Sequence, residues 1–258
     1  MAFLNAKSIS MQFGGLLAVD NFSFYIDEGE IVSLIGPNGA GKTTVFNMIT
    51  GVYKTTSGTM EFKGHILDGK TPQEIVALGI SRTFQNPRLF PKMRVIENVL
   101  IGTHIRTKYS FLDGVFRTKR FQCEEAEKTI RAIKILESIG LYEHINSYAG
   151  SLPYGEQRKL EIARAIATDA ELLLLDEPAA GMNPAETEEL LQFIRDLKNR
   201  GFTIFLIEHD MRVVMNISDR IYVLDHGELI AHGTPNEIIN NERVIEAYLG
   251  GERKHVKN

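Results

Sequence analysis

The stretch "GPNGAGKTT" (36–44) decides the fold. From Gly36 to Thr43 it matches the pattern G-x-x-x-x-G-K-[ST]. The apolar run "EIVSLIG" (30–36) reads as a strand that leads into it, and a helical pattern follows from about Gly41 to Thr50. A strand, a glycine loop and a helix in this order are the context that the motif requires, so the sequence predicts a phosphate-binding loop.

The residue types of this loop explain its expected role. Glycines let the backbone wrap closely, so that successive N–H groups and the helix N-terminus face phosphate oxygens. Lys42 adds a positive charge at the β- and γ-phosphates, and the Thr43 hydroxyl can ligate Mg²⁺. A purely structural glycine turn is the alternative. The candidate nucleotide-binding residues are Gly36, Pro37, Asn38, Gly39, Ala40, Gly41, Lys42, Thr43 and Thr44.

A second motif, "LLLLDEP" (172–178), supplies two adjacent carboxylates. Its leucines bring a strand out at its carboxyl end, where ligands bind in open α/β sheets. We expect Asp176 to hold Mg²⁺, directly or through water, and Glu177 to act as general base on an attacking water. Two such carboxylates on a buried strand are costly without a cation, whereas solvated loop acids, the alternative, need no such strand.

Strand and helix patterns alternate at both ends of the chain and enclose a helix-rich middle, at about 86–165. The runs "LLLL" (172–175) and "IFLI" (204–207) lack alternation, which is typical of central strands in a parallel sheet covered on both faces. This pattern predicts an α/β core with an inserted helical subdomain. Strands are expected at 21–26, 30–36, 58–64, 171–176, 203–208, 220–225 and 228–231, and helices at 41–50, from 71, at 122–139, at 184–200 and after 210.

Composition places few further limits on function. The 258 residues can bury a sizeable core, and a net charge of −4 is too mild to argue for a nucleic-acid partner. The single Cys123 excludes an internal disulfide and fits a reducing compartment. The N-terminal residues lack a signal-peptide pattern, and no apolar run approaches a membrane span. We therefore expect a cytoplasmic protein that reaches any membrane through a partner.

The stretch "SLPYGEQRKLEIARAI" (151–166) contains a second glycine-marked helix start. It reads as an amphipathic helix opened by Tyr154 and Gly155. The apolar stripe of this helix is formed by Ile162, Ala163, Ile166 and Ala167.

Together these elements resemble the ATP-binding cassette (ABC) ATPases over essentially the whole chain. Residues 152–157 resemble the signature of that family, usually Leu-Ser-Gly-Gly-Gln, with Pro153 and Tyr154 as departures. In the family two cassettes pack head to tail, and each signature helix caps the nucleotide of the other chain. The resemblance implies ATP and Mg²⁺ as cofactors, a second ABC ATPase chain as partner, and nucleotide contacts from Tyr154, Gly155 and Glu156. A helix start with only a structural role is the alternative.

The resemblance also completes the expected fold class. It is α/β, with a P-loop NTPase core around a mostly parallel sheet, an N-terminal antiparallel β subdomain and an inserted α-helical subdomain. The expected boundaries are 1–85 and 166–235 for the core, 86–165 for the helical signature subdomain, and 236–258 for a C-terminal helix and flexible tail, with "GGERKHVKN" (250–258) frayed.

Further family positions fall on single residues. Phe13 matches the aromatic that stacks on adenine, unless it is a core phenylalanine. Gln85 matches the glutamine that meets Mg²⁺ and water and links to the membrane partner, and His209 matches the histidine that contacts the γ-phosphate; an ordinary polar or histidine side chain is the alternative for each. Asn183 replaces the usual aspartate of the loop that crosses the dimer interface, and it also reads as a helix cap.

Several stretches narrow the resemblance to the ATPase subunits of bacterial branched-chain amino-acid importers, among them "SRTFQNPRLF" (81–90) and "VIEAYLGG" (244–251). The implied partners are integral-membrane permease subunits and, indirectly, a substrate-binding protein, at the inner face of the cell membrane. A lipid or lipopolysaccharide export ATPase remains an alternative, as do a soluble ABC ATPase of DNA repair or translation and a P-loop kinase or switch.

Two basic stretches are candidate contact regions. Residues 86–94 surround two prolines with basic side chains and read either as a docking segment for a transmembrane subunit or as a plain loop. Residues 104–121 mix basic and aromatic side chains. They read either as a contact to a membrane partner or anionic headgroups, or as a helical hairpin with buried aromatics, which is the reading that we favour.

Overall fold

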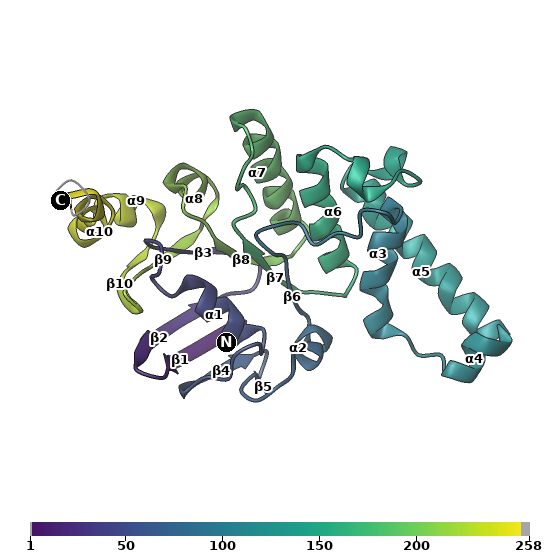
Figure 1. The fold of residues 1–258 in the computed structure, drawn as a ribbon, viewed down its shortest axis with the longest axis horizontal. Helices are drawn as coiled ribbons and strands as arrows, with labels where there is room; N and C mark the ends of the chain where they lie inside the picture. Colours follow the sequence, from purple (N-terminus) through teal and green to yellow (C-terminus); the bar gives the residue numbers. More distant parts are fainter. Residues whose placement is uncertain (1, 254–258) are drawn as a thin grey trace.

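The computed structural model describes residues 2–253 and has two β-sheets (Figure 1). The larger sheet has the strand order β10-β9-β3-β8-β7-β6, and all of its neighbouring pairs are parallel except β10 with β9. This arrangement confirms the predicted α/β class with a mostly parallel sheet. Its strands are β3 (Ile31–Ile35), β6 (Ile80–Arg82), β7 (Leu172–Asp176), β8 (Thr203–Ile207), β9 (Arg220–Asp225) and β10 (Glu228–Gly233).

The centre of this sheet is apolar because helices and the second sheet cover its two faces. Every residue of β3, β7 and β8 is buried, as the runs without alternation predict. The phosphate loop follows β3, and Asp176 is the last residue of β7. Because both strands are parallel to β8, which lies between them, their carboxyl ends place the two motifs at one edge of the sheet.

The smaller sheet is antiparallel, in the order β2-β1-β4-β5, and packs its apolar face on the core. The sequence predicts only parts of it. β1 alternates weakly and is interrupted by register shifts, which hides its period of two. The strands are β1 (Leu4–Phe13), β2 (Leu16–Ile26), β4 (Ser57–Phe62) and β5 (His65–Ile66).

Two of the helices around the core begin with capping boxes. α2 begins with a Thr71–Glu74 capping box, at the helix start expected from residue 71. α7 begins with an Asn183–Glu186 capping box, which confirms the predicted cap at Asn183. The bounds of these helices and of the neighbouring core helices are α1 (Lys42–Ile49), α2 (Pro72–Leu78), α7 (Pro184–Asn199) and α8 (Met211–Ile217).

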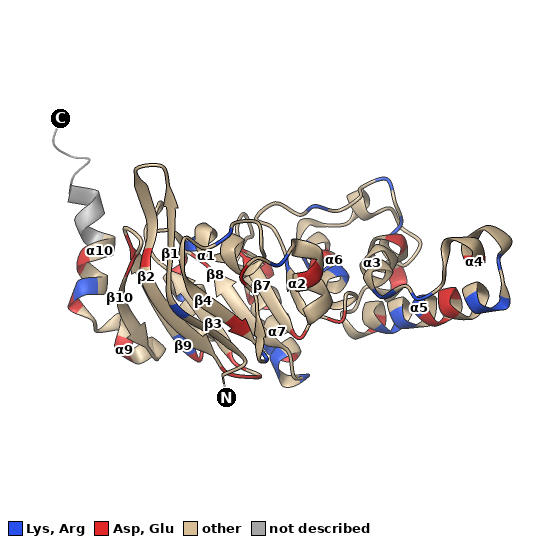
Figure 2. Ribbon diagram, turned by 90° about the horizontal axis from the view of Figure 1, so that it is seen from below, with Lys and Arg blue, Asp and Glu red and all other residues tan. Residues whose placement is uncertain are grey.

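The middle of the chain forms helices that extend to one side of the molecule (Figures 1 and 2). We call this group of helices, residues 95–166, the arm. α6 packs against α3 and α5, and Ile162, Ala163, Ile166 and Ala167 are buried, as the stripe predicts. The helices are α3 (Val95–Thr103), α4 (Phe111–Phe116), α5 (Lys119–Ser138) and α6 (Tyr154–Ile166), with short 3₁₀ turns at His104–Arg106, Tyr142–His144 and Ala149–Ser151.

The favoured reading of residues 104–121 is wrong in one respect. Phe111 is 83% exposed and Phe116 is 74% exposed, so these aromatics are not buried. The Ser110–Asp113 capping box fixes α4 as a helix, and Leu112 and Val115 are exposed with the two phenylalanines. A short helix at the end of an arm has too few neighbours to cover its apolar residues, although their pattern resembles that of a core helix.

The chain ends in two helices, α9 (Pro235–Ile239) and α10 (Glu242–Arg253), instead of the single helix expected there. Residues 250–253, expected to be frayed, belong to α10, and the rest of that prediction lies outside the described residues. None of the helices in the part of the chain that the structure describes is long and apolar enough to cross a membrane.

Candidate functional site

The phosphate loop needs glycine at Gly36 and Gly41 for reasons internal to this chain. Both have backbone angles that L side chains rarely adopt, with φ of 149° and 99°. A Cβ on Gly36 would lie 2.0 Å from the Leu224 carbonyl oxygen, and one on Gly41 would lie 2.5 Å from the Ala18 carbonyl oxygen. The loop is therefore wedged between neighbouring backbone segments, and Gly41 begins α1 without a side-chain cap, which leaves the helix N–H groups free of a capping side chain.

Lys42 lies inside this loop. Its ammonium group donates to the carbonyl oxygens of Gly36, at 2.8 Å, and Pro37, at 2.9 Å. Burial lowers the pKa of Lys42, and the negative charges of Glu177 and Asp176 oppose this shift. A buried cation with only neutral carbonyl partners is suited to an anionic ligand. Thr43 is exposed, and Thr44, the next residue of α1, is half-buried.

Asp176 ends β7 and is 6% exposed. Its Oδ2 accepts a hydrogen bond from the Arg82 guanidinium at 2.6 Å. Arg82 comes from the adjacent strand β6 and also donates to Asn47 on α1. Arg82 was not among the predicted site residues; the available signal was a basic residue at the end of a short strand segment.

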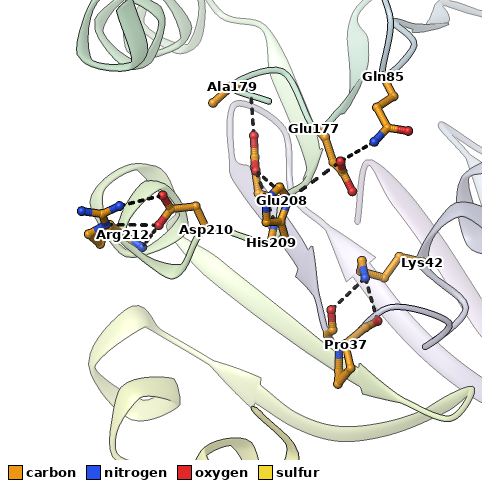
Figure 3. A network of polar contacts seen from close by, with 10 residues as sticks. Pro37, Lys42, Gln85, Glu177, Ala179, Glu208, His209, Asp210 and Arg212 are labelled. Atoms are coloured by element: carbon orange, nitrogen blue, oxygen red, sulfur yellow. Dashed lines mark hydrogen bonds and ion pairs between the residues drawn. The ribbon is translucent and has the colours of Figure 1, made fainter. Parts of the chain in front are cut away.

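Three residues predicted to act in catalysis come together at this edge (Figure 3). Gln85 Nε2 donates to Glu177 Oε2 at 2.7 Å, and His209 Nδ1 lies 3.8 Å from the same oxygen. Glu177 has a positive φ of 46°, and its amide donates to the Ile207 carbonyl. A strained backbone that follows β7 and is hydrogen-bonded to β8 aims the carboxylate of Glu177 at Gln85 and His209.

Glu208 is a further site residue that sequence reasoning missed. It is 1% exposed, and its carboxylate accepts from the amides of Ala179 and His209, at 3.0 and 3.2 Å. Burial raises the pKa of Glu208, and the two amides oppose this shift. This carboxylate joins the segment after Glu177 to the segment that carries His209. The available signal was an acidic residue at the end of the apolar run 203–207.

Phe13 lies at the end of β1 and is 40% exposed, so it is not the core phenylalanine of the alternative reading. Its ring meets that of Tyr53 edge-on, with centroids 5.1 Å apart. This contact leaves an aromatic surface open to a planar partner.

The signature residues are placed elsewhere, on α6 among the helices of the arm (Figure 1). The Tyr154 hydroxyl is used within this chain, because it donates to the Ala180 carbonyl at 3.2 Å and accepts from Arg158 at 2.9 Å. Glu156 lies in the first turn, and its carboxylate is 3.7 Å from His144. The Tyr154 hydroxyl is thus engaged within this chain, whereas Glu156 Oε2 is buried and has no hydrogen-bond partner among the described residues.

Gly155 has no internal reason to be glycine. A Cβ built there meets nothing within 4 Å, and its backbone is helical. The open space in front of this residue leaves room for something outside this chain.

The residues present fit a magnesium nucleotide. Thr43, Gln85 and Asp176 offer hydroxyl, amide and carboxylate oxygens, which are ligand types that Mg²⁺ accepts. Among the described residues no group of three or more His, Cys, Asp or Glu side chains could hold a metal by itself. Phosphate oxygens would have to complete the coordination, as they do where Mg²⁺ enters with a nucleotide.

Comparisons with known proteins agree with this geometry. The family described as "ABC transporter" matches residues 19–180, and the family described as "Branched-chain amino acid ATP-binding cassette transporter" matches residues 228–254. The chain is 54% identical over 248 residues to the high-affinity branched-chain amino acid transport ATP-binding protein LivG of Salmonella typhimurium, covering 96% of this chain and 97% of that protein. It is 47% identical, with the same coverage, to the corresponding protein BraF of Pseudomonas aeruginosa.

Solved structures show the same fold. A nucleotide-free ATP-binding cassette from an ABC transporter superposes with a TM-score of 0.84 at 35% identity, covering 96% of this chain and 99% of that one. The ADP conformation of MJ1267, an ATP-binding cassette of an ABC transporter, gives a TM-score of 0.85 at 35% identity, covering 97% and 99%. With the phosphate loop, the acidic strand end and the second helix start in place, the chain belongs to the ABC transporter family, as one of its ATP-binding ATPase subunits.

Proposed function

We propose that this chain hydrolyses ATP to drive the uptake of branched-chain amino acids through integral-membrane permease subunits. The observation that carries the substrate class is the 54% identity to a branched-chain amino acid transport ATP-binding protein, which extends over nearly the whole of both chains. The match of residues 228–254 to a family described by the same substrate supports it independently, because it lies outside the nucleotide motifs.

In this proposal the loop 36–44 binds the phosphates and Phe13 stacks on the base. Lys42 exchanges its two carbonyl partners for phosphate oxygens, which relieves a buried and weakly compensated cation. Thr43, Asp176 and Gln85 would hold Mg²⁺, which would supply positive charge against the phosphates. Arg82 shares the Asp176 carboxylate and keeps it oriented.

Glu177 is the proposed general base. It accepts the proton of the attacking water, while Gln85 and His209 hold the carboxylate and the water in place from two sides. Glu208 fixes the His209 amide and so positions that side chain. The reaction is complete only when the Gly155 end of α6 of a second cassette, identical or related, covers the phosphate.

The division of labour follows the expected boundaries. Residues 1–85 and 166–235 hold the nucleotide, residues 86–165 present the signature to the second chain, and residues 236–258 form a C-terminal addition. Segment 86–94 leads directly from Gln85 into the arm and is the proposed contact to the permease, which places the chain at the inner face of the cell membrane. A substrate-binding protein acts through the permease.

The test is reconstitution of the chain with its permease subunits in lipid nanodiscs. Phosphate release is measured with the substrate-binding protein loaded with leucine, isoleucine or valine, or with lysine. We expect phosphate release to be stimulated by the binding protein loaded with a branched-chain amino acid and not by the one loaded with lysine. The complex with Glu177→Gln is the control for phosphate released by contaminating ATPases. Equal stimulation by lysine, or none by leucine, contradicts the substrate assignment.

A further inference from the structure

Arg158 has the largest fully buried side chain among the described residues, and no motif of the nucleotide site includes it. It lies on α6, one turn after Tyr154, and is 1% exposed. Removing a guanidinium from water is costly unless its N–H groups find acceptors with good geometry. The partners of Arg158 therefore show what this residue holds in place.

Two of these partners are backbone carbonyls in the segment that leads into the arm. Arg158 Nη1 donates to the Phe84 carbonyl at 2.7 Å, and Nη2 donates to the Gln85 carbonyl. The side chain of this same Gln85 contacts Glu177. Arg158 is thus hydrogen-bonded to the backbone of Gln85, and the side chain of Gln85 contacts the proposed general base, Glu177.

Glu161, one turn further along α6, binds the amide groups of the same segment. Its carboxylate accepts from the amides of Phe84 and Arg88, each at 3.3 Å, and lies 3.4 Å from Arg158. Burial raises the pKa of Glu161, whereas the two amides and Arg158 oppose this shift. The pair on α6 therefore fixes residues 84–88 by their carbonyls and their amides together.

A further partner, Tyr154, connects these contacts to the signature. Arg158 Nη2 donates to the Tyr154 hydroxyl, which in turn donates to the Ala180 carbonyl, three residues after Glu177. Tyr154 precedes Gly155, where the helix end is open to a second chain. One guanidinium is thus bonded to the beginning of the signature helix, to the backbone of Gln85 and, through Tyr154, to the segment after Glu177.

We propose that Arg158 is a positioning residue that ties the Gly155 end of α6 to Gln85, so that contact of a second cassette at Gly155 is transmitted to the amide that orients Glu177. This inference rests on the proposed role of Gln85 in hydrolysis. It predicts that the helix start and the Gln85 segment move as one body when the two cassettes close.

The fork of an arginine is required for this link. Its Nη1 and Nη2 reach acceptors on two different elements at once, whereas an ammonium is a single point donor. Arg158→Lys keeps the charge beside Glu161 and loses the fork. Arg164→Lys is the matched control, because Arg164 also lies on α6 and donates to a carbonyl of the same segment, that of Arg88, without contacting Gln85.

The test measures phosphate release by the permease complex at saturating ATP. Arg158→Lys is expected to lower kcat about tenfold, since a small misplacement of a catalytic group is enough for such a loss. The affinity of the isolated chain for ATP stays unchanged, because the contacts of loop 36–44 are untouched. Arg164→Lys leaves kcat within about twofold. A fall in ATP affinity that matches the fall in kcat overturns the inference.

A double-mutant cycle with Gln85→Ala separates a link from general damage. If Arg158 acts through Gln85, Arg158→Lys has no further effect on kcat once Gln85 is alanine. Equal losses in both backgrounds, or no loss from Gln85→Ala alone, overturn the inference. Should Arg158→Lys fail to fold, Tyr154→Phe carries the same cycle with an expected loss of about threefold. If loaded binding protein does not stimulate phosphate release by the wild-type complex, the proposed function is refuted. The rate of phosphate release without binding protein still tests the role of Arg158.

Discussion

The two glycine-marked helix starts of this chain look alike in sequence and differ in what surrounds them. Gly36 and Gly41 are glycine because the chain's own backbone leaves no space for a Cβ and bends through angles that other residues avoid. Gly155 has ordinary helical geometry and open space in front of it. The first site is thus built within one chain, whereas we propose that the second is half of a site that another chain completes.

The largest expected effect lies at the completed site. Glu177→Gln keeps the size of the side chain and the contact to Gln85 but removes the base, so we expect turnover to fall by roughly 10²–10³-fold with nucleotide binding intact. A stable dimer then accumulates in ATP, visible by size-exclusion chromatography with light scattering. Turnover near the parent rate would remove Glu177 from this role.

The next effect tests whether the open site meets a phosphate. Gly155→Asp places an anion there, and a like-charge contact costs several kcal/mol, which corresponds to an ATP-driven dimer weakened by about 10²-fold or more. Titration of the monomer should show unchanged ATP affinity. Gly155→Asn is the neutral control of the same shape and should retain more of the dimer. If aspartate and asparagine behave alike, charge is not the reason.

A third comparison uses the same substitution at both helix starts. Gly41→Ala forces a Cβ against the Ala18 carbonyl and should lower the free energy of unfolding by about 2–4 kcal/mol. Gly155→Ala should leave it unchanged or raise it by up to about 1 kcal/mol, because alanine favours the helix. Urea denaturation of the nucleotide-free chain measures both. Equal destabilisation would show that Gly155 also has an internal steric role.

The smallest effect concerns the loop between the two sites. Asn183 accepts from the amides of Ala185 and Glu186, so Asn183→Ala should cost about 1 kcal/mol of unfolding free energy. Asn183→Asp keeps the cap and should cost nothing. If alanine weakens the ATP-driven dimer by more than the loss of stability explains, this residue also acts at the interface.

The sequence was informative wherever function depends on local pattern. The apolar runs before Gly36, Asp176 and Glu208 predict buried parallel strands. Their carboxyl ends bring Lys42, Glu177 and His209 to one edge. Contacts between distant segments could not be read in this way. Arg158 meets Gln85 across 73 positions, and nothing in a helical pattern tells a buried guanidinium from a solvated one.

The same limit applies to Tyr154 and to α4. The contact of Tyr154 with the nucleotide of a second chain stays a prediction, and its sequence position gave no sign that its hydroxyl also bonds Ala180 and Arg158 within the chain. The aromatics of α4 were expected inside, and the arm has no second layer to cover them. Residue type reports how much a side chain gains from burial, whereas only the tertiary structure decides whether a neighbour is there.

The uncovered tip of α4 has a practical consequence for anyone handling the purified chain. This tip exposes an apolar patch formed by Phe111, Leu112, Val115 and Phe116. We therefore expect self-association of the chain that needs no nucleotide and becomes stronger in sulfate. Closure around ATP depends on charge and responds to salt in the opposite direction. Light scattering without nucleotide at two salt concentrations therefore sets the background against which every dimer measurement on this protein has to be judged.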